Sequence, residues 1–303
     1  MTGIRQLLQL RLGLRSRVGL ALGGGAAKGA AHIGVLRALD EQSIKIEAIS
    51  GTSVGAAIAA LYAFDKSLED IYQLAQGMTA AKISRFTLKR KGFSSTERIR
   101  QLLIEQLGNV NIEEASIPLA IIAADIRTGD KKVFRKGSVA DAVAASAAIP
   151  GIFIPVEIDG HEYVDGGIVE NVPVSPLRAM GANTVIAVNL NGVQRYPVPQ
   201  NALDVVSNAL DIAINSRTWM QVQAANVHIA LDLKQYSLTD NRDRTDELID
   251  VAYQETRRHI GRIQWQRHTV FLQHLHTLYR GLTPLRVPAL LRQIKSRWIG
   301  KNH

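Results

Sequence analysis

A G-x-S-x-G pentapeptide is the segment of the sequence best suited to nucleophilic chemistry. It spans residues 51–55, with Ser53 between Gly51 and Gly55, and it lies between a short apolar run and a stretch of small, helix-forming residues. In a nucleophile elbow, a sharp turn from strand to helix presents the serine hydroxyl at the end of a sheet, and the glycines avoid clashes with neighbouring backbone. Ser53 could equally cap the following helix, because serine is a preferred N-cap residue. The pentapeptide alone leaves both interpretations open.

A serine hydroxyl becomes an effective nucleophile only when a base accepts its proton. The hydrolase elbow is typically followed along the chain by an acid and then a histidine, but no histidine here occupies a convincing loop after a predicted strand. Asp165 is followed by Gly166 and Gly167, which suits a carboxylate presented from a tight turn. A lone Asp-Gly-Gly is most often simply a turn, so these residues do not identify the base by themselves.

A glycine-rich segment over residues 23–29, Gly-Gly-Gly-Ala-Ala-Lys-Gly, connects a predicted strand to a predicted helix. Backbone N–H groups at such a helix start can hold a phosphate or the oxyanion of a tetrahedral intermediate. Alternatively, the segment only connects the strand to the helix and binds no anion. The segment is not a Walker A loop, because Lys28 precedes Gly29 and no Ser or Thr follows, and its glycine spacing does not match the dinucleotide-binding fingerprint.

The elements that must position these groups alternate between strand and helix. The predicted strands cover residues 18–22, 46–50, 117–125 and 184–190. The first two predicted helices, which follow the first two strands, cover residues 26–39 and 56–64. Continuous apolar strands are typical of a parallel sheet with both faces covered, which indicates an α/β layered fold. Residues 65–116 are expected to form a polar, mainly helical excursion with a basic loop at 89–92, and residues 191–201 a loop.

Composition excludes several kinds of site and of protein. The 303 residues include no Cys, which rules out disulfides, Cys-ligated zinc, iron–sulfur clusters and Cys nucleophiles and allows a reducing compartment. No run of eighteen apolar residues predicts a membrane-spanning helix. The start of the chain imitates a signal peptide, but glycines and charged residues interrupt its apolar region, so we interpret it as mature sequence. A cytoplasmic protein with peripheral membrane association is the expectation.

Charge is distributed unevenly, and this suggests three regions: residues 1–17, 18–256 and 257–303. The two end regions hold no Asp or Glu, and the last carries ten Arg or Lys, whereas the middle region contains all 27 acidic residues. Two apolar stripes at helical spacing run through the last region, from Phe271 to Leu282 and from Val287 to Trp298. These basic helices either pack on the body or bind an anionic membrane surface; nucleic acid is an improbable partner because no recognition module accompanies the charge.

The ordered segments together resemble the patatin-like phospholipase family, in particular bacterial members similar to neuropathy target esterase. The resemblance runs from Val18 to about Leu233 and includes the glycine-rich loop, Ala31-His32-Ile33-Gly34, the G-x-S-x-G, Asp165-Gly166-Gly167 and Asn171-Val172-Pro173. It implies a three-layer α/β/α fold with a mostly parallel central sheet. It also implies a serine hydrolase without metal or cofactor, acting on phospholipid or lysophospholipid.

The resemblance assigns roles residue by residue. Ser53 is the implied nucleophile and Asp165 the general base of a dyad, which accounts for the missing histidine. Gly24, Gly25 and Ala26 are the implied oxyanion-hole donors, supported by Lys28 and by the glycines at 51, 55, 166 and 167.

Two residues depart from the family pattern, since Ala26 replaces a glycine and Lys28 an arginine. The backbone N–H of Ala26 can still donate to an oxyanion if the φ of Ala26 is negative. Lys28 keeps the positive charge of arginine but lacks its planar guanidinium group.

Other residues that match the family are expected to be structural: His32 in a satisfied hydrogen bond, Asp125 ordering the turn at 128–129, and Asn171 bracing the loop of Asp165. Three alternatives to a hydrolase remain open. They are a transacylase on the same dyad, a non-catalytic phosphate- or nucleotide-binding protein, and a membrane scaffold with a vestigial site.

Overall fold

An eight-stranded mixed sheet forms the centre of the fold in the computed structural model, which describes residues 16–77, 85–89, 92–193, 196, 198–236 and 241–279. The sheet runs in the order β10-β9-β1-β2-β5-β8-β7, and β6 pairs with β5 beside this path. Its strands are β1 (Val18–Leu22), β2 (Ala48–Thr52), β5 (Leu119–Asp125), β6 (Lys131–Phe134), β7 (Val156–Ile158), β8 (His161–Asp165), β9 (Thr184–Asn189) and β10 (Val227–Ala230). A separate antiparallel hairpin joins β3 (Arg85–Lys89) and β4 (Gly92–Ser95).

The register of β5 brings the ends of β2 and β8 together. Five strands, from β10 to β5, are parallel, whereas β6 and β8 are antiparallel to β5 and β7 is antiparallel to β8. Thr52, the last residue of β2, pairs with Ile122, and Asp165, the last residue of β8, pairs with Ala123. Because Ile122 and Ala123 are consecutive, the residues that follow β2 and end β8 lie at one place on the sheet.

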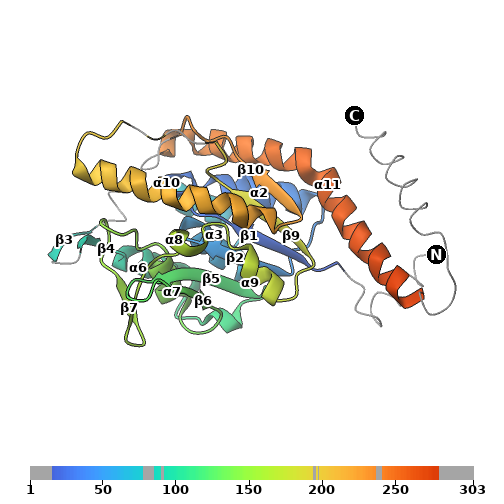
Figure 1. The fold of residues 1–303 in the computed structure, drawn as a ribbon, viewed down its shortest axis with the longest axis horizontal. Helices are drawn as coiled ribbons and strands as arrows, with labels where there is room; N and C mark the ends of the chain where they lie inside the picture. The colour runs from blue at the N-terminus through green and yellow to red at the C-terminus, as the bar shows by residue number, and fades with distance from the viewer. Residues whose placement is uncertain are drawn as a thin grey trace. The chain divides into compact units, whose positions relative to one another are not determined.

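Helices cover both faces of the sheet, which explains why β1, β2, β5 and β9 are buried along their whole length. One face carries α8 (Gly167–Glu170), α9 (Val174–Ala179) and α10 (Ala202–Gln223), and the other carries α2 (Ala31–Glu41), α3 (Val54–Ala63) and α7 (Val139–Ser146) (Figure 1). The remaining helical segments are α4 (Leu68–Gly77), α6 (Glu97–Leu107), α11 (Thr245–Tyr279) and three short 3-10 turns, η1 (Ala26–Lys28), η2 (Ile112–Glu114) and η3 (Arg242–Arg244).

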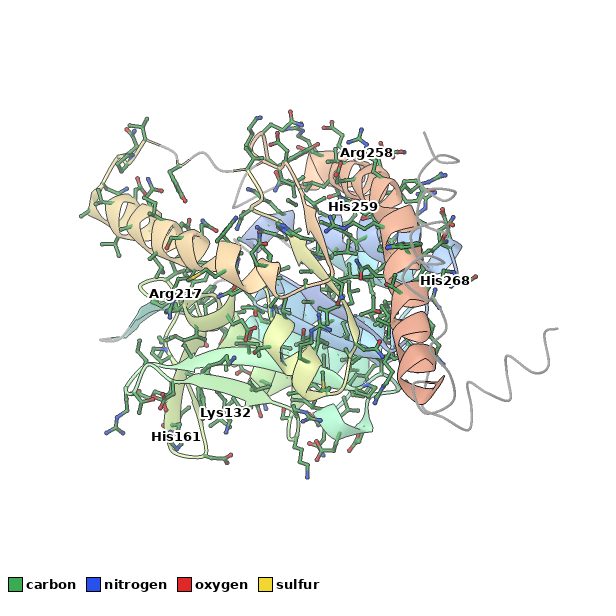
Figure 2. All side chains as sticks on the ribbon, turned by 45° about the vertical axis from the view of Figure 1, so that its right-hand side comes forward. Lys132, His161, Arg217, Arg258, His259 and His268 are labelled. Atoms are coloured by element: carbon green, nitrogen blue, oxygen red, sulfur yellow. The ribbon has the colours of Figure 1, made fainter. Side chains whose placement is uncertain are left out.

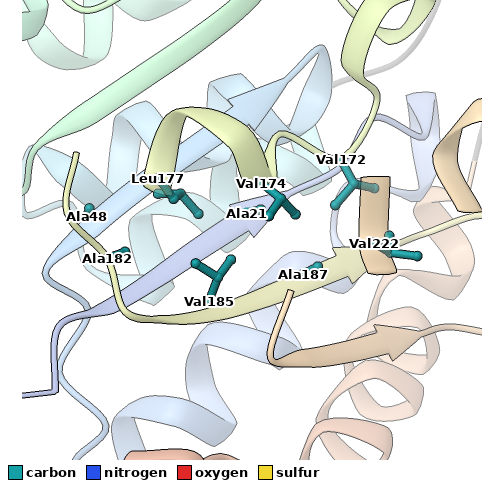
Figure 3. Packing of buried hydrophobic residues seen from close by; sticks show 9 residues of the cluster. All are labelled: Ala21, Ala48, Val172, Val174, Leu177, Ala182, Val185, Ala187 and Val222. Atoms are coloured by element: carbon teal, nitrogen blue, oxygen red, sulfur yellow. The ribbon is translucent and has the colours of Figure 1, made fainter. Parts of the chain in front are cut away.

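Small apolar side chains let the helices approach the sheet closely. Figure 3 shows the cluster between the strands and α9 and α10, in which alanines of β1, β2 and β9 face the larger side chains of α9. The cluster consists of Ala21, Ala48, Val172, Val174, Leu177, Ala182, Val185, Ala187 and Val222. This packing fixes the loop between α8 and α9, which leads away from the end of β8.

The α/β/α fold class predicted from the sequence is confirmed, with an antiparallel edge in addition to the parallel strands. The predicted strand at 46–50 begins and ends two residues later, as β2. The helix expected to begin at residue 26 is wrong in its first turn, because η1 is a single 3-10 turn and α2 begins at Ala31. The excursion at 65–116 contains α4, the β3–β4 hairpin, α6 and η2, and part of its basic loop lies outside the described residues.

By internal packing, the chain divides into one unit of residues 17–259 and another that combines residues 1–16 with 260–303. The helix α11 passes through the boundary between the two. The predicted basic segment at 1–17 lies almost entirely outside the described residues, as do the side chains of both predicted C-terminal stripes. Among the described helices, none is long and apolar enough to cross a membrane.

Candidate active site

Ser53 stands at the turn between β2 and α3 in a backbone conformation that serine rarely adopts. Its φ and ψ are 55° and −125°, and they turn the chain sharply from strand to helix, as in a nucleophile elbow. Ser53 occupies the N-cap position of α3, but its side chain makes no capping hydrogen bond. The side chain of Ser53 instead acts on the carboxyl of Asp165, whose pKa it lowers. The interpretation of Ser53 as a helix cap is therefore wrong.

The two glycines of the pentapeptide are required by close approaches of the backbone. A Cβ atom on Gly51 would lie 2.3 Å from the carbonyl oxygen of Gly55, and one on Gly55 would lie 2.2 Å from that of Leu22. Neither contact could be relieved without moving main chain. The reason given for these glycines from the sequence, clearance from neighbouring backbone, is confirmed.

Asp165 lies buried beside Ser53, and its Oδ1 accepts a hydrogen bond from the backbone N–H of Gly167 at 2.7 Å. Burial raises the pKa of the Asp165 carboxyl from 3.8 to about 6, and the negative charge of Asp211 raises it further. The Gly167 N–H and the side chain of Ser53 oppose this shift. A carboxylate with this pKa is ionised near neutral pH and is basic enough to accept a proton there.

Ser146, at the C-terminal end of α7, holds both residues in place. Its Oγ accepts a hydrogen bond from the Ser53 N–H at 2.8 Å, and its carbonyl oxygen accepts one from the Gly166 N–H at 3.3 Å. The Asp165 N–H donates to the carbonyl of Ala148 at 2.9 Å. The end of α7 therefore positions the serine and the carboxylate together. The sequence analysis gave Ser146 no role, because one serine in an alanine-rich run carries no distinctive signal.

The glycine-rich loop after β1 lies against Ser53, since a Cβ atom on Gly24 would be 3.4 Å from the Cβ of Ser53. The Gly24 N–H donates to the carbonyl oxygen of Asn171 at 3.2 Å. Among the residues that the structure describes, none accepts a hydrogen bond from the N–H of Gly25 or Ala26. Two of the three predicted oxyanion donors therefore have an N–H available for a ligand, and Gly24 anchors the loop instead.

Ala26 does not keep the negative φ on which its role as a simple substitute for glycine depended. Its φ is 50°, in the left-handed region, and Gly25 before it has an extended φ of 174°. The left-handed conformation costs an alanine roughly 1–2 kcal/mol relative to its preferred regions. The packing around the loop holds this conformation, which sets the direction of the Ala26 N–H.

Lys28 is buried at the end of the same loop and interacts electrostatically with the carboxylate of Asp211 on α10. Its Nζ donates to Oδ1 of Asn191 at 3.4 Å. Burial lowers the pKa of Lys28, and the charges of Asp211 and Asp232 oppose that shift. Burial likewise raises the pKa of Asp211, opposed by Lys28. Asp211 therefore acts on both Lys28 and Asp165, a connection that the sequence analysis missed because an acid within a helix carries no signal of its own.

Asp125 orders the turn that follows it, as expected, whereas the expectation of a satisfied hydrogen bond holds for only one ring nitrogen of His32, because its buried Nδ1 has no hydrogen-bond partner. Asp125 accepts hydrogen bonds from the two N–H groups at the turn that follows it, at 2.9 and 3.1 Å, and it pairs with His161 at 2.8 Å. The Nε2 of His32 lies 2.8 Å from the carbonyl oxygen of Gly23, and burial lowers the pKa of His32 to about 4. In the described part of the chain, no group of three or more His, Asp or Glu side chains is placed to hold a metal ion.

Comparison with known proteins identifies the class to which this fold and site belong. The family model for patatin-like phospholipase matches residues 20–178, more than half of the chain. This match includes the glycine-rich loop, the serine elbow and Asp165. The chain belongs to the patatin-like phospholipase family.

The chain is also similar to individual proteins of this family and to a solved structure. An uncharacterized NTE family protein of Mycobacterium tuberculosis is 34% identical over 212 residues, covering 69% of this chain and 59% of that protein. The lysophospholipase NTE1 of Candida glabrata is 31% identical over 182 residues, covering 58% of this chain and 10% of that protein. The chain thus spans less than two thirds of each relative. Among solved structures, VipD from Legionella pneumophila shares the fold, with a TM-score of 0.57 at 15% identity over 86% of this chain and 67% of VipD.

Proposed function

We propose that this protein is a lipid acyl hydrolase of the phospholipase or lysophospholipase type, with Ser53 and Asp165 as its catalytic dyad. The observation that carries the proposal is the placement of an elbow serine beside a buried carboxyl, whose pKa burial raises to about 6 and on which the serine side chain acts. Membership of the patatin-like phospholipase family and the likeness to a fungal lysophospholipase support a lipid ester as the substrate.

The dyad supports a two-step reaction in which every proton has a place. Ser53 Oγ attacks the acyl carbon of the ester while its proton passes to Asp165, and the tetrahedral intermediate then expels the alcohol oxygen, which takes that proton. Water next attacks the acyl-enzyme and gives a proton to Asp165. Collapse of the second intermediate breaks the bond to Ser53, returns the proton to its oxygen and releases the fatty acid.

The N–H groups of Gly25 and Ala26 are the proposed oxyanion donors. Both belong to the loop that contacts Ser53, and no described residue accepts from them. Preorganised amides of this kind stabilise the charge that develops on the carbonyl oxygen, and losing one such donor typically slows acyl transfer by about 100- to 1,000-fold. Gly24 contributes by fixing the loop to Asn171, and Lys28 supports the site through its charge.

Covalent labelling by a fluorophosphonate probe tests the proposal. We expect labelling of the wild-type protein on Ser53, no adduct in Ser53→Ala, and much weaker labelling in Asp165→Asn. Ser67→Ala is the matched control, because the Ser67 hydroxyl accepts from the Asp70 N–H in an ordinary helix-start arrangement, and this variant should label like wild type. A folded wild-type protein without an adduct would contradict the proposal.

Product analysis separates hydrolysis from acyl transfer on the same dyad. With a lysophospholipid as sole substrate, a hydrolase releases free fatty acid in proportion to the lipid consumed. Formation of a diacyl lipid at the expense of free fatty acid would identify a transacylase instead.

A further inference from the structure

The exposed face of α10 is apolar, contrary to the pattern of an ordinary surface helix. Nine large apolar side chains are exposed among the residues that the structure describes, and eight of them lie between residues 193 and 220. Five are on α10 itself and are at least half exposed: Val205, Val206, Ile212, Trp219 and Met220. These five residues are called the α10 face below.

Charge is almost absent from this side of α10. The other exposed positions of the helix are mainly small or uncharged, namely Ala202, Ala209, Ala213, Ser216 and Gln223. Arg217 is the single exposed charged residue among the described side chains of α10, and its guanidinium donates to the carbonyl oxygen of Ile168 (Figure 2). A contiguous uncharged apolar surface of this kind marks a binding surface.

The polar residues of α10 are used on the inward side of the helix. Gln221 accepts from the Val172 N–H at 3.1 Å and donates to the carbonyl oxygen of Val169 at 3.3 Å. Asp211 acts electrostatically on Lys28 and Asp165. The body of the protein therefore holds α10 through Gln221, Asp211 and the buried Val222, and it leaves the five residues of the α10 face outside.

The helix α10 borders the candidate active site through residues other than those of the α10 face. The side chain of Ile214 lies 3.5 Å from the position that a Cβ atom of Gly167 would take, two residues after Asp165. The hydrogen bonds of Arg217 and Gln221 go to α8, the helix that begins directly after the Asp-Gly turn. One helix thus carries the apolar face outward and contacts the catalytic turn inward.

We propose that the α10 face docks the protein on a lipid bilayer by inserting apolar side chains at the boundary between headgroups and acyl chains. The proposal rests on the proposed function, because a lipid ester resides in a bilayer and the helix that carries the face also contacts the turn after Asp165. Trp219 is the residue type that favours this boundary, and a helix of 22 residues, about 33 Å long, can lie along it. Since the face is uncharged, docking depends on apolar insertion and does not require anionic lipid.

Trp219 supplies a direct probe of insertion in the 303-residue chain. The protein has three Trp residues, so Trp265→Phe with Trp298→Phe leaves Trp219 as the only one. We expect its emission to shift to shorter wavelength with vesicles of phosphatidylcholine and to be quenched by brominated phosphatidylcholine, at high salt as at low salt. Emission that is unchanged by these vesicles would overturn the proposal.

A pair of matched variants tests the face by sedimentation with the same vesicles. The double variant Ile212→Gln with Trp219→Gln keeps helix-forming residues and should reduce partitioning at least about tenfold, since each buried apolar side chain of this size contributes more than a tenfold preference. Ile126→Gln removes the one large exposed apolar side chain of the described residues that lies outside residues 193–220, and this variant should partition like wild type.

The outcomes separate docking from catalysis and from other occupants of the face. Both variants should keep fluorophosphonate labelling and turnover of a short-chain monomeric ester. A wild type that binds vesicles but never labels would refute the proposed function and leave docking intact. Unchanged vesicle binding by the α10 variant would overturn the docking proposal, as would binding seen only with phosphatidylglycerol and lost at high salt. A wild-type dimer that the α10 variant converts to monomer, without effect on vesicle binding, would assign the face to a second copy of this chain.

Discussion

Replacing Asp165 by asparagine should abolish turnover and, at neutral pH, stabilise the protein. The pKa of the Asp165 carboxyl is about 6 in the folded protein and 3.8 as its ordinary value. The folded state therefore holds the proton more tightly than the unfolded state does. The stability that this proton contributes is complete below the unfolded pKa and is lost as the pH rises through the folded pKa.

The difference between the two pKa values sets an upper limit on this loss. It corresponds to about 3 kcal/mol of unfolding free energy at pH values well above 6. Asparagine has the same shape, cannot ionise, and can still accept the hydrogen bond from the Gly167 N–H through its Oδ1. Asp165→Asn should thus raise the melting temperature at pH ~8 by several degrees, up to about 10 °C, for a domain of this size. The advantage should disappear near pH 4, where both forms are neutral.

Asp125→Asn is the matched control because its effect should have the opposite sign. His161 and two backbone N–H groups lower the pKa of Asp125, so its carboxylate contributes stability above the unfolded pKa that is lost as the pH falls. The measurement is the melting temperature of wild type and both variants from about pH 4 to pH 8. An Asp165→Asn protein less stable than wild type by the same amount at every pH would refute the reasoning, since it would mean that Asp165 serves as an uncharged structural residue.

Four further predictions concern the same site. Asp211→Asn should move the rising limb of the pH profile of kcat/KM to lower pH, because the charge of Asp211 raises the pKa of Asp165; an unmoved midpoint would remove Asp211 from the network. Gly55→Ala should lower the melting temperature sharply or prevent folding, because its Cβ would lie 2.2 Å from a carbonyl oxygen of β1. Ala26→Gly should retain fluorophosphonate labelling, because φ of 50° suits glycine, and loss of labelling would show that the alanine methyl is needed. Charging of His32 in the unfolded state only should lower the unfolding free energy from pH 6.5 toward pH 4, whereas protonation of Asp165 acts in the opposite direction; in urea titrations at both pH values, the unfolding free energy of the wild type relative to that of His32→Gln should therefore fall over this range.

Much of the fold and of the candidate site follows from the sequence because the controlling interactions are local. Glycine at positions 51 and 55 is required within one strand-to-helix turn, and the apolar runs of β1, β5 and β9 match strands buried on both faces. Helix starts were less certain, since the 3-10 turn at Ala26–Lys28 has the same composition as the helix that follows it. The prediction that residues 18–256 form the catalytic domain stays a prediction, as does the role of the basic ends.

Only the tertiary structure shows what surrounds the serine. A helix cap and a nucleophile have the same local sequence. In the structure, Ser53 makes no capping hydrogen bond, and the pairing of β2 and β8 with consecutive residues of β5 brings it beside Asp165. The same holds for Ser146, which joins both residues through the end of α7. These contacts link segments far apart along the chain, and no short pattern records them.

The orientation of α10 was decided in the same way. Its apolar and polar residues can be counted from the sequence, and the usual rule would bury the apolar ones. In the structure, Val222 is buried as that rule expects, but five large apolar side chains of α10 are exposed, while Asp211 and Gln221 interact with Lys28 and with the backbone of Val169 and Val172. The sequence by itself determined the strands, the turns and the reactive residue types. The sheet register and the packing of α10 determined which of those residues meet, because a contact between distant segments exists only once the chain between them has folded.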